Sequence, residues 1–361
     1  MSRLSEMIKE LCPNGVEYRR LGETVSICRG IRVVRAELQS EGEYPVYQNS
    51  LIPMGYYDKS NCSGRTSFII GAGAAGEIGY SEVDFWAADD CFYFVCEENV
   101  NNRFLYHVLL GQESLIKGQV RKASIPRLSR TVVEKLLIPV PPLPIQNEIV
   151  KMLDNFTELT AELTAELQLR KKQYSFYRDS LLNFSRDDAE VEWKTLGETT
   201  KSISSGKNKI RFVDGEYPVY GSTGIIGYCT NFVYEHAQIL VARVGSVGYV
   251  QIADGRYDVS DNTLIVDVLS TINMKYIFYY LGYMNLSRLA HGAGQPLITA
   301  GQLKKLIIPI PPLETQAKIV SILDRFDTLC HDLTQGLPAE IAARKKQYEY
   351  YRDKLLAFQQ K

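Results

Sequence analysis

Several features that would assign the chain to a common protein class are missing from its sequence. No run of about 18 apolar residues occurs in its 361 residues, which argues against a membrane span. Residues 1–11 are charged and amphipathic rather than a signal peptide, which predicts a cytoplasmic protein. The seven cysteines and four histidines form no C-x-x-C pair and no metal-ligand spacing. We therefore expect reduced thiols and no metal site.

An excess of positive charge is also missing, because the formal net charge is −1. A protein that bound nucleic acid through bulk positive charge would be more basic. Any DNA binding must therefore rest on local basic patches, or on a partner that supplies phosphate contacts.

What the sequence does contain is a duplication of itself. Four segments return at an offset of about 170–175 residues: 16–24, 42–47, 136–143 and 170–179 recur as 191–199, 215–220, 306–313 and 344–353. Between these matching edges the two copies differ almost everywhere. This pattern indicates one scaffold that carries two different surfaces, rather than a solenoid of short repeats.

Each copy begins with a globular part that is rich in Tyr, Val, Ile, Gly and turn residues. Short β-branched and aromatic runs predict strands at Ser67–Ile70, Phe92–Val95, Gln238–Val241 and Thr263–Val266. Short helices are predicted at Asn102–Leu110 and Met274–Tyr283. Each globular part is therefore expected to be a mixed α/β domain that ends at a proline pair.

After the first proline pair, Gln146 to about Leu182 contains neither proline nor glycine. Its apolar positions follow a heptad pattern, with exceptions at Thr160 and Arg170: Ile149, Leu153, Phe156, Leu163, Leu167, Tyr174, Tyr177 and Leu181. The second copy repeats it at Ile319, Leu323, Phe326, Cys330, Leu333, Leu337, Ile341, Arg344, Tyr348, Tyr351 and Leu355. The step from Leu337 to Ile341 is a four-residue stutter beside Gly336 and Pro338, where we expect a kink.

The order along the chain predicts how these helices pair. The first leaves domain one for domain two, and the second can only return, so we expect them to pair antiparallel and to bring the C-terminus back to an N-terminal helix at Ser5–Leu11. Packing of each helix on its own domain, or pairing with another chain, is the alternative. The expected fold class is α+β: two α/β domains joined by a long antiparallel two-helix coiled coil, with pseudo-two-fold symmetry. The expected parts are an N-terminal helical segment (1–15), domain 1 (16–142), a central long helix (143–185), domain 2 (186–312) and a C-terminal long helix (313–361).

Two related but different readers held at a fixed separation would suit an asymmetric, two-part duplex sequence, since half-site spacing mirrors protein symmetry in dimeric DNA readers. The repeated frame also resembles a known family. Its elements are E-L-C-P-N-G-V-E-Y-R-R-L-G-E at 10–23, the Y-P-V-Y segments, I-P-x-P-P-L-x-x-Q before each long helix, and R-K-K-Q-Y near each helix end. Together they resemble the specificity subunits of type I restriction–modification enzymes over essentially the whole chain. Gly292–Ile298 also resembles that family, whereas the first copy departs from it at Ala123–Leu128.

The resemblance implies two recognition domains similar to that of a type II adenine methyltransferase, each reading half of a bipartite site. It implies methyltransferase (modification) subunits that use S-adenosylmethionine, and restriction (translocase) subunits that use ATP and Mg²⁺. The chain itself would bind no cofactor and would not be an enzyme. The alternative function is a stand-alone DNA-binding or coiled-coil adaptor module without restriction partners.

Candidate DNA-binding residues are polar or basic side chains in turns and loops. Arginine can pair with guanine, and glutamine or asparagine with adenine. In the first copy they are Arg29, Arg32, Arg35, Gln48, Asn49, Ser50, Arg65, Arg121, Lys122 and Arg127. In the second copy they are Lys207, Lys209, Arg211, Ser222, Thr223, Arg243, Arg288 and His291. Solvated side chains without a function are the competing interpretation, which the recurrence of the basic clusters in both copies makes less attractive.

Three other motifs argue against catalysis. Gly71–Gly76 matches G-x-G-x-x-G, but no helix pattern follows, so it predicts a tight turn rather than a nucleotide site. Val140 and Ile310 stand before the proline pairs, where an adenine methyltransferase of the N-P-P-Y type needs a polar residue. Asp89-Asp90 and Asp261-Asn262 lack catalytic partners in the sequence and are interpreted as turn residues.

Overall fold

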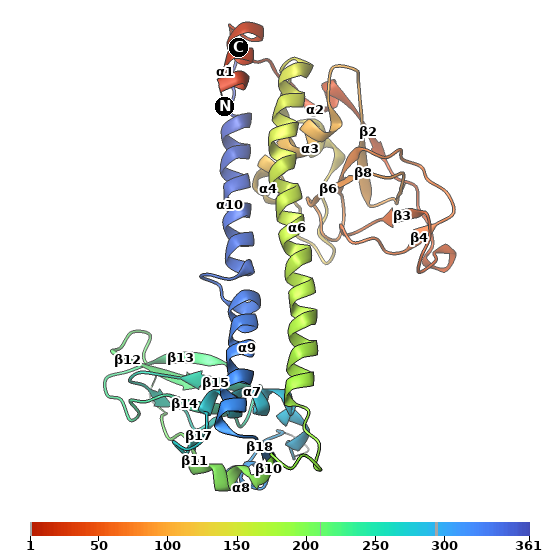
Figure 1. The fold of residues 1–361 in the computed structure, drawn as a ribbon. Helices are drawn as coiled ribbons and strands as arrows, with labels where there is room; N and C mark the ends of the chain where they lie inside the picture. Colours follow the sequence, from red (N-terminus) through yellow and green to blue (C-terminus); the bar gives the residue numbers. More distant parts are fainter. Residues whose placement is uncertain (1, 210, 293–294) are drawn as a thin grey trace. The chain divides into compact units, whose positions relative to one another are not determined.

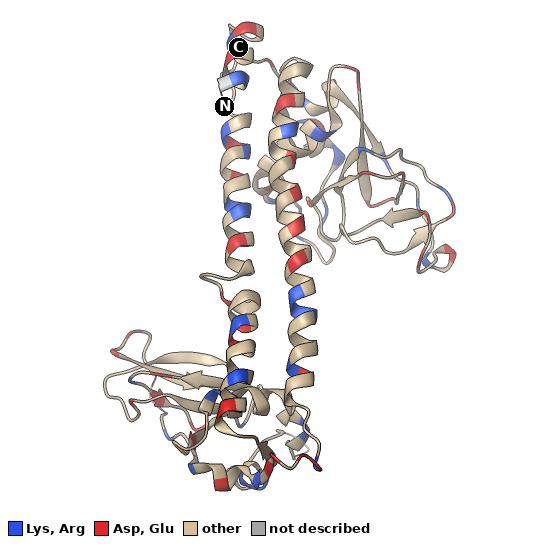
Figure 2. Cartoon of the chain, viewed as in Figure 1, with Lys and Arg blue, Asp and Glu red and all other residues tan. Residues whose placement is uncertain are grey.

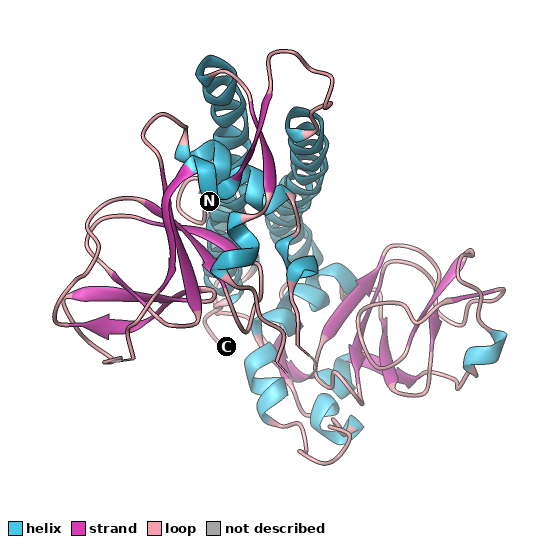
Figure 3. Ribbon diagram, turned by 90° about the horizontal axis from the view of Figure 1, so that it is seen from below, coloured by secondary structure: helices cyan, strands magenta, loops and turns pink. Residues whose placement is uncertain are grey.

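The chain forms two compact units in a computed structural model that describes residues 2–209, 211–292 and 295–361. Unit 1 spans Met1–Thr164 and Glu340–Lys361, and unit 2 spans Ala165–Ala339. Two helices, α6 (Leu143–Leu182) and α10 (Leu337–Leu356), contribute residues to both units. In each unit the strands gather in a globular part beside the helices (Figures 1 and 3).

The other elements of unit 1 are α1 (Ser2–Leu11), β1 (Tyr18–Arg20), α2 (Leu21–Thr24), β2 (Val25–Arg29), η1 (Arg35–Glu37), β3 (Tyr44–Tyr47), β4 (Tyr56–Tyr57), β5 (Thr66–Ile70), β6 (Ile78–Ser81), β7 (Trp86–Ala87), β8 (Cys91–Cys96), α3 (Asn102–Gly111), α4 (Glu113–Gly118), α5 (Arg130–Glu134) and β9 (Leu137–Pro139). Those of unit 2 are β10 (Glu192–Thr195), η2 (Leu196–Thr199), β11 (Thr200–Ser205), β12 (Tyr217–Gly221), β13 (Gly224–Cys229), β14 (Gln238–Ala242), β15 (Val250–Ala253), β16 (Asp258–Val259), β17 (Thr263–Val268), α7 (Met274–Tyr283), η3 (Leu286–Leu289), α8 (Ala300–Lys304), β18 (Ile307–Ile310) and α9 (Leu313–His331).

The duplication in the sequence is a duplication of topology. The four-stranded sheet has the order β2-β8-β5-β6 in unit 1 and β11-β17-β14-β15 in unit 2. The three-stranded sheets, β4-β3-β7 and β13-β12-β16, share one parallel pairing at the same place. The two-stranded sheets β1-β9 and β10-β18 join the first and last strands of each globular part. The predicted mixed α/β domains, their strands and their short helices are confirmed.

The strands form where β-branched and aromatic residues cluster, because these side chains pack well on a pleated sheet. Every residue of β14 is buried, and β5 is buried from Ser67 to Ile70, as suits strands paired on both sides. In unit 1 a buried cluster joins the sheet and α3 to Ile149 and Leu153 of α6 and Leu355 of α10. Each long helix therefore packs on a globular part as well as on another helix.

Pairing of the long helices is seen inside each unit. In unit 1, Phe156 of α6 stacks on Tyr351 of α10 with 5.3 Å between ring centroids, and the two segments run in opposite directions (Figure 1). In unit 2, Tyr177 of α6 stacks on Phe326 of α9 at 5.4 Å, and Tyr174 meets His331 at 5.7 Å. The partner number rises as the α6 number falls, so this pair is antiparallel as well.

The kink expected near Gly336 is wrong in one respect, because the helix stops there completely. α9 ends at His331, and Asp332 Oδ1 accepts hydrogen bonds from the Thr334 backbone and hydroxyl at 2.7 and 2.6 Å, which competes with helix formation. An added Cβ on Gly336 would lie 2.4 Å from a backbone carbonyl oxygen, so only glycine fits. Leu333, expected in the heptad pattern, is 80% exposed because residues 332–336 form a loop between α9 and α10.

The chain ends of unit 1 pair as expected. The Val16 backbone N–H donates to Gln359 at 2.8 Å, and the Lys361 N–H donates to Val16 at 3.1 Å. Leu4 of α1 belongs to the same buried cluster as Leu355 of α10. The N-terminal helix and the C-terminal segment are therefore parts of one core.

A buried glutamine fixes the start of each long helix, five residues after the first proline of its pair. Gln146 accepts a hydrogen bond from the Asn101 N–H at 2.8 Å and donates to the carbonyls of Asn99 and Pro141 at 2.9 and 2.7 Å. Gln316 repeats two of these bonds in unit 2, accepting at 2.9 Å and donating to Pro311 at 2.7 Å. The motif I-P-x-P-P-L-x-x-Q is thus a joint between the globular part and the helix.

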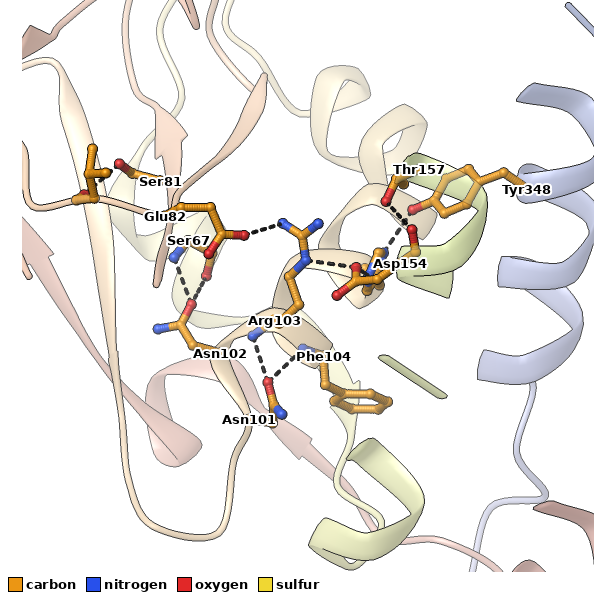
Figure 4. A network of polar contacts seen from close by, with 12 residues as sticks. Ser67, Ser81, Glu82, Asn101, Asn102, Arg103, Phe104, Asp154, Thr157 and Tyr348 are labelled. Atoms are coloured by element: carbon orange, nitrogen blue, oxygen red, sulfur yellow. Dashed lines mark hydrogen bonds and ion pairs between the residues drawn. The ribbon is translucent and has the colours of Figure 1, made fainter. Parts of the chain in front are cut away.

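Further along α6, Asp154 holds α3 against the helix (Figure 4). Its Oδ1 lies 2.8 Å from Arg103 Nε and 2.9 Å from Nε2 of the buried His107. His107 Nδ1 lies 2.9 Å from the Tyr348 hydroxyl of α10. Since the carboxylate only accepts, Nε2 carries the proton and Nδ1 accepts from the tyrosine. In unit 2, Asp324 meets Lys275 Nζ at 2.7 Å and the Tyr279 hydroxyl at 2.6 Å.

The charges of this network follow from burial and from its hydrogen bonds. Burial lowers the pKa of His107, outweighing the hydrogen bond to Asp154. Partial burial would raise the pKa of Asp154, but hydrogen bonds from His107 and Arg103 lower it overall. Burial raises the pKa of Tyr348, which therefore remains a hydroxyl donor.

Replacing the buried glutamine should destabilise unit 1. We expect Gln146→Leu to lower the free energy of unfolding by about 2–4 kcal/mol, because the N–H and carbonyl groups that it satisfies would stay buried without partners. Gln168→Leu, on an exposed position of α6, is the control and should change stability by less than about 0.5 kcal/mol. Urea unfolding followed by circular dichroism measures both. An equal loss of stability in the two variants would contradict the role of Gln146 in joining the helix to the globular part.

The His107 network should make stability depend on pH. A histidine whose pKa is lower when folded than when unfolded takes up its proton on unfolding, so stability is present above about pH 6.5 and is lost as the pH falls below it. We expect the urea midpoint to fall between pH 7.5 and 5.5, and His107→Gln to flatten that fall.

Tyr348→Phe is the matched control for this measurement. It removes one hydrogen bond but keeps the histidine, so it should cost about 1 kcal/mol at every pH and leave the slope in place. A His107→Gln variant with the wild-type slope would show that other groups govern the acid loss of stability.

Candidate nucleic-acid interface

Among the described residues of each unit, lysine and arginine form no continuous stripe, since they are interspersed with aspartate and glutamate (Figure 2). The basic residues of interest gather instead in concave sites on the globular part of unit 1. The larger concavity has a volume of about 710 Å³. We call it the arginine pocket: Arg29, Arg121, Arg127 and Arg130, with Asp89, Asp90, Gln119 and Ser129.

Three elements bring these arginines together. Arg29 ends β2, and its Nε donates to the Asp89 carbonyl at 2.7 Å. Arg121 and Arg127 stand opposite each other as a β-bridge at the base of a small loop, so their side chains project from one short segment. Among the described residues, neither of these two guanidinium groups has a side-chain hydrogen bond or an ion pair. Arg130 is paired with Glu134 at 2.8 Å.

Two carboxylates line the same pocket. Asp89 and Asp90 form the turn before β8, as the sequence predicted, and the Asp90 carbonyl accepts from the Gly71 N–H at 2.6 Å. Nothing in the sequence indicated that their side chains would line the same pocket as the arginines. In the described part of the chain, Asp89 Oδ1 is buried without a hydrogen-bond partner, which is rare and costly for a charged group. The residues of the pocket therefore leave one of its hydrogen-bond acceptors without a donor.

A second concavity of about 430 Å³ lies at the loop before β3 and the turn after it. Arg32, Arg35, Gln48 and Asn49 line it, so four candidates from two sequence segments meet here. The Asn49 carbonyl accepts from the Ala74 N–H at 2.9 Å, which fastens this turn to the loop that follows β5.

Three candidates of unit 1 line neither concavity. Ser50 donates to the Ile52 carbonyl at 3.0 Å within its own turn. Arg65 has a left-handed backbone, with φ of 57°, in the turn before β5. Lys122 is exposed beside Arg121.

In unit 2 the candidates come from four separate segments of the chain. Lys207 and Lys209 are exposed, and Arg211 donates to the Ser260 hydroxyl at 3.1 Å. The Ser222 hydroxyl donates to the Val244 carbonyl at 2.8 Å, next to the exposed Thr223.

The remaining candidates of unit 2 come after β14 and in and after η3. Arg243 reaches the Ser205 hydroxyl at 3.5 Å. Arg288 donates to the Met284 carbonyl at 2.6 Å and caps its own turn, and His291 lies 2.8 Å from Gln302 Nε2. Of the family-like segment 292–298, residues 293 and 294 lie outside the described residues.

The described part of the chain contains no group of three or more His, Cys, Asp or Glu side chains placed to hold a metal ion. None of its helices combines the length and the apolar character that crossing a bilayer requires.

Comparisons with known proteins agree with the duplicated frame. The family model described as the type I restriction modification DNA specificity domain matches twice, at residues 13–170 and 190–343. A Haemophilus influenzae protein that carries the name of type I restriction enzyme specificity subunit S.HindORF215P is 32% identical over 375 residues, covering 95% of this chain and 96% of the relative. The type I restriction enzyme EcoR124I/EcoR124II specificity subunit of Escherichia coli is 36% identical over 318 residues, covering 77% of this chain and 76% of the relative.

A solved structure has the same fold. The crystal structure of a type I restriction–modification S subunit from M. genitalium superposes with a TM-score of 0.73 at 18% identity, covering 95% of this chain and 97% of that one. The likeness at this level of identity concerns the fold alone.

Proposed function

Because the chain belongs to the family of type I restriction–modification DNA specificity subunits, we propose that it reads a two-part sequence in duplex DNA, one part with each unit. The observation that carries this proposal is that the two units have the same strand order but different side chains in their loops. A shared scaffold with unlike polar surfaces suits two unlike half-sites.

The catalytic steps belong to partner subunits. In this proposal the methyltransferase subunits bind S-adenosylmethionine, the restriction subunits use ATP and Mg²⁺, and this chain supplies recognition and assembly without making or breaking a bond. The arginine pocket fits that role, because guanidinium groups donate hydrogen bonds to bases and phosphates, and carboxylates accept hydrogen bonds from the amino groups of bases.

The compartment is the cytoplasm, where the chromosome and these partners meet. All seven cysteines are free thiols. Burial raises the pKa of Cys62 and of Cys96 to about 12, so these thiols stay protonated and unreactive. Unpaired, buried cysteines suit a reducing environment.

Exchanging one globular part should change one half of the target. We expect replacement of residues 16–142 by the corresponding part of a relative to alter one half of a methylated split motif and to leave the other half unchanged. Single-molecule sequencing of genomic DNA from cells that carry the chain and its methyltransferase partner measures the motif. The reciprocal exchange of residues 186–312 is the control, and an unaltered motif in both would count decisively against the proposal.

The chain alone should bind DNA weakly. Its net charge is −1, and the arginine pocket includes two carboxylates, so few phosphates can be neutralised without partner subunits. Fluorescence anisotropy should give a Kd of about 10⁻⁴–10⁻⁶ M for the chain, and binding tighter by at least about a thousandfold once the methyltransferase subunits are added. Tight, specific binding by the chain alone would favour a stand-alone reader.

A further inference from the structure

The arginine pocket occupies a place in unit 1 whose backbone frame recurs in unit 2. The Gly71 N–H donates to the Asp90 carbonyl at 2.6 Å, and the Arg243 N–H donates to the Asn262 carbonyl at 2.9 Å. In both units this bond ties the end of a central strand, β5 or β14, to the turn before its neighbour, β8 or β17. The two turns are therefore equivalent.

The loop that carries the arginines recurs too. Arg121 and Arg127 form a β-bridge, as do His291 and Leu297. In each case the residue after the bridge donates its N–H to the end of the central strand, Leu128 to Gly71 at 2.8 Å and Ile298 to Arg243 at 3.0 Å. The base of each loop is thus hydrogen-bonded to the equivalent position at the end of the central strand.

At a third edge of the pocket, each unit has a glycine that no other residue can replace. An added Cβ would lie 2.2 Å from a backbone carbonyl oxygen at Gly30 and 2.3 Å from one at Gly206, so both positions require glycine. Arg29 and Ser205 precede these glycines and end their strands, β2 and β11. All three edges of the pocket therefore have counterparts in unit 2.

The side chains on this common frame differ in charge. From unit 1 to unit 2, Arg29 becomes Ser205, Arg121 becomes His291, Arg127 becomes Leu297, Asp90 becomes Asn262, and Gly71 becomes Arg243. Since the backbone hydrogen bonds are the same in both units, they form regardless of which side chains are present at these positions. The charges of these side chains are therefore available for a ligand.

The charged groups that line the pocket identify that ligand. The Arg121 and Arg127 guanidiniums are without partners among the described residues, and each can donate two parallel hydrogen bonds. A phosphate would be attracted to them but repelled by Asp89 and Asp90, which line the same pocket. A G·C pair offers guanine O6 and N7 as acceptors and cytosine N4 as a donor on one edge, which matches both charges of the pocket.

On these grounds, and resting on the proposed function, we propose that the arginine pocket reads a G·C base pair in the major groove, with Arg121 and Arg127 on guanine and the Asp89–Asp90 turn accepting from cytosine. The equivalent site of unit 2, with a single arginine at the position of Gly71, reads a different base pair. The exchanged positions thus determine the sequence of each half-site.

The test transfers the residues of unit 2 onto unit 1. Arg121→His and Arg127→Leu are compatible with the frame, because it carries those residues in the second unit. With the methyltransferase subunits present, single-molecule sequencing should find that one G·C position of one half-site becomes degenerate, while the other half-site and the spacer stay unchanged. Arg19→Ser, an exposed arginine of β1 paired with Glu17, is the control for loss of charge and should leave the motif intact.

A binding assay tests the guanine contact directly. In duplexes that carry the wild-type motif, replacing that guanine by 7-deazaguanine removes the N7 acceptor and should weaken binding of the wild-type complex about tenfold, but that of the double variant little further. If the double variant does not assemble, Arg121→His alone is measured in the same way.

The outcomes separate the two proposals. An unchanged motif with uniformly weaker methylation and a smaller salt slope would mean that the arginines contact phosphates, and it would overturn the base-reading proposal alone. No split motif with the wild-type chain would overturn the proposed function and this inference together. A degenerate G·C position that is also insensitive to 7-deazaguanine in the double variant would support both.

Discussion

The hydrogen bonds of one buried glutamine at the start of each long helix constrain the rest of the structure. Gln146 and Gln316 each hold the N–H that begins the short helix of the globular part and the carbonyl of the proline pair that precedes the long helix. A side-chain amide that is bonded on both sides leaves little freedom in how the helix departs from the domain. Asp154 adds a second contact two turns later (Figure 4), so the direction of the helix is fixed at two points.

The fold was predictable where local sequence periodicity controls it. The internal duplication, the heptad spacing after Gln146 and the β-branched runs each predicted elements that the structure contains. The break at 332–336 was not predictable from periodicity, because an Asx-type turn at Asp332 and a close approach at Gly336 decide it. Such tertiary and capping effects leave only a weak trace in the spacing of apolar residues.

The candidate interface was predictable only in part. Basic residues in loops were recognisable as candidates, and the structure brings Arg29, Arg121 and Arg127 into one pocket. The spacing of residues does not show that the carboxylates of Asp89 and Asp90 line this pocket, since their proximity to arginines about 30–40 residues later depends on sheet order. Their recurrence as Asp261-Asn262 was the signal that could have pointed to them. A frame that keeps its backbone bonds while its charges change is visible only when the two units are compared in three dimensions.

The interruption between α9 and α10 has a mechanical consequence. In α6 every residue belongs to one continuous hydrogen-bond ladder, so a single inserted residue would turn everything after it by about 100° around the helix axis. Between Asp332 and Gly336 the chain is already outside any helix, and an added residue there would only lengthen a solvent-facing loop. A change in chain length within α6 thus becomes a rotation of the helical residues that follow it, whereas the same change between Asp332 and Gly336 alters only the length of a loop.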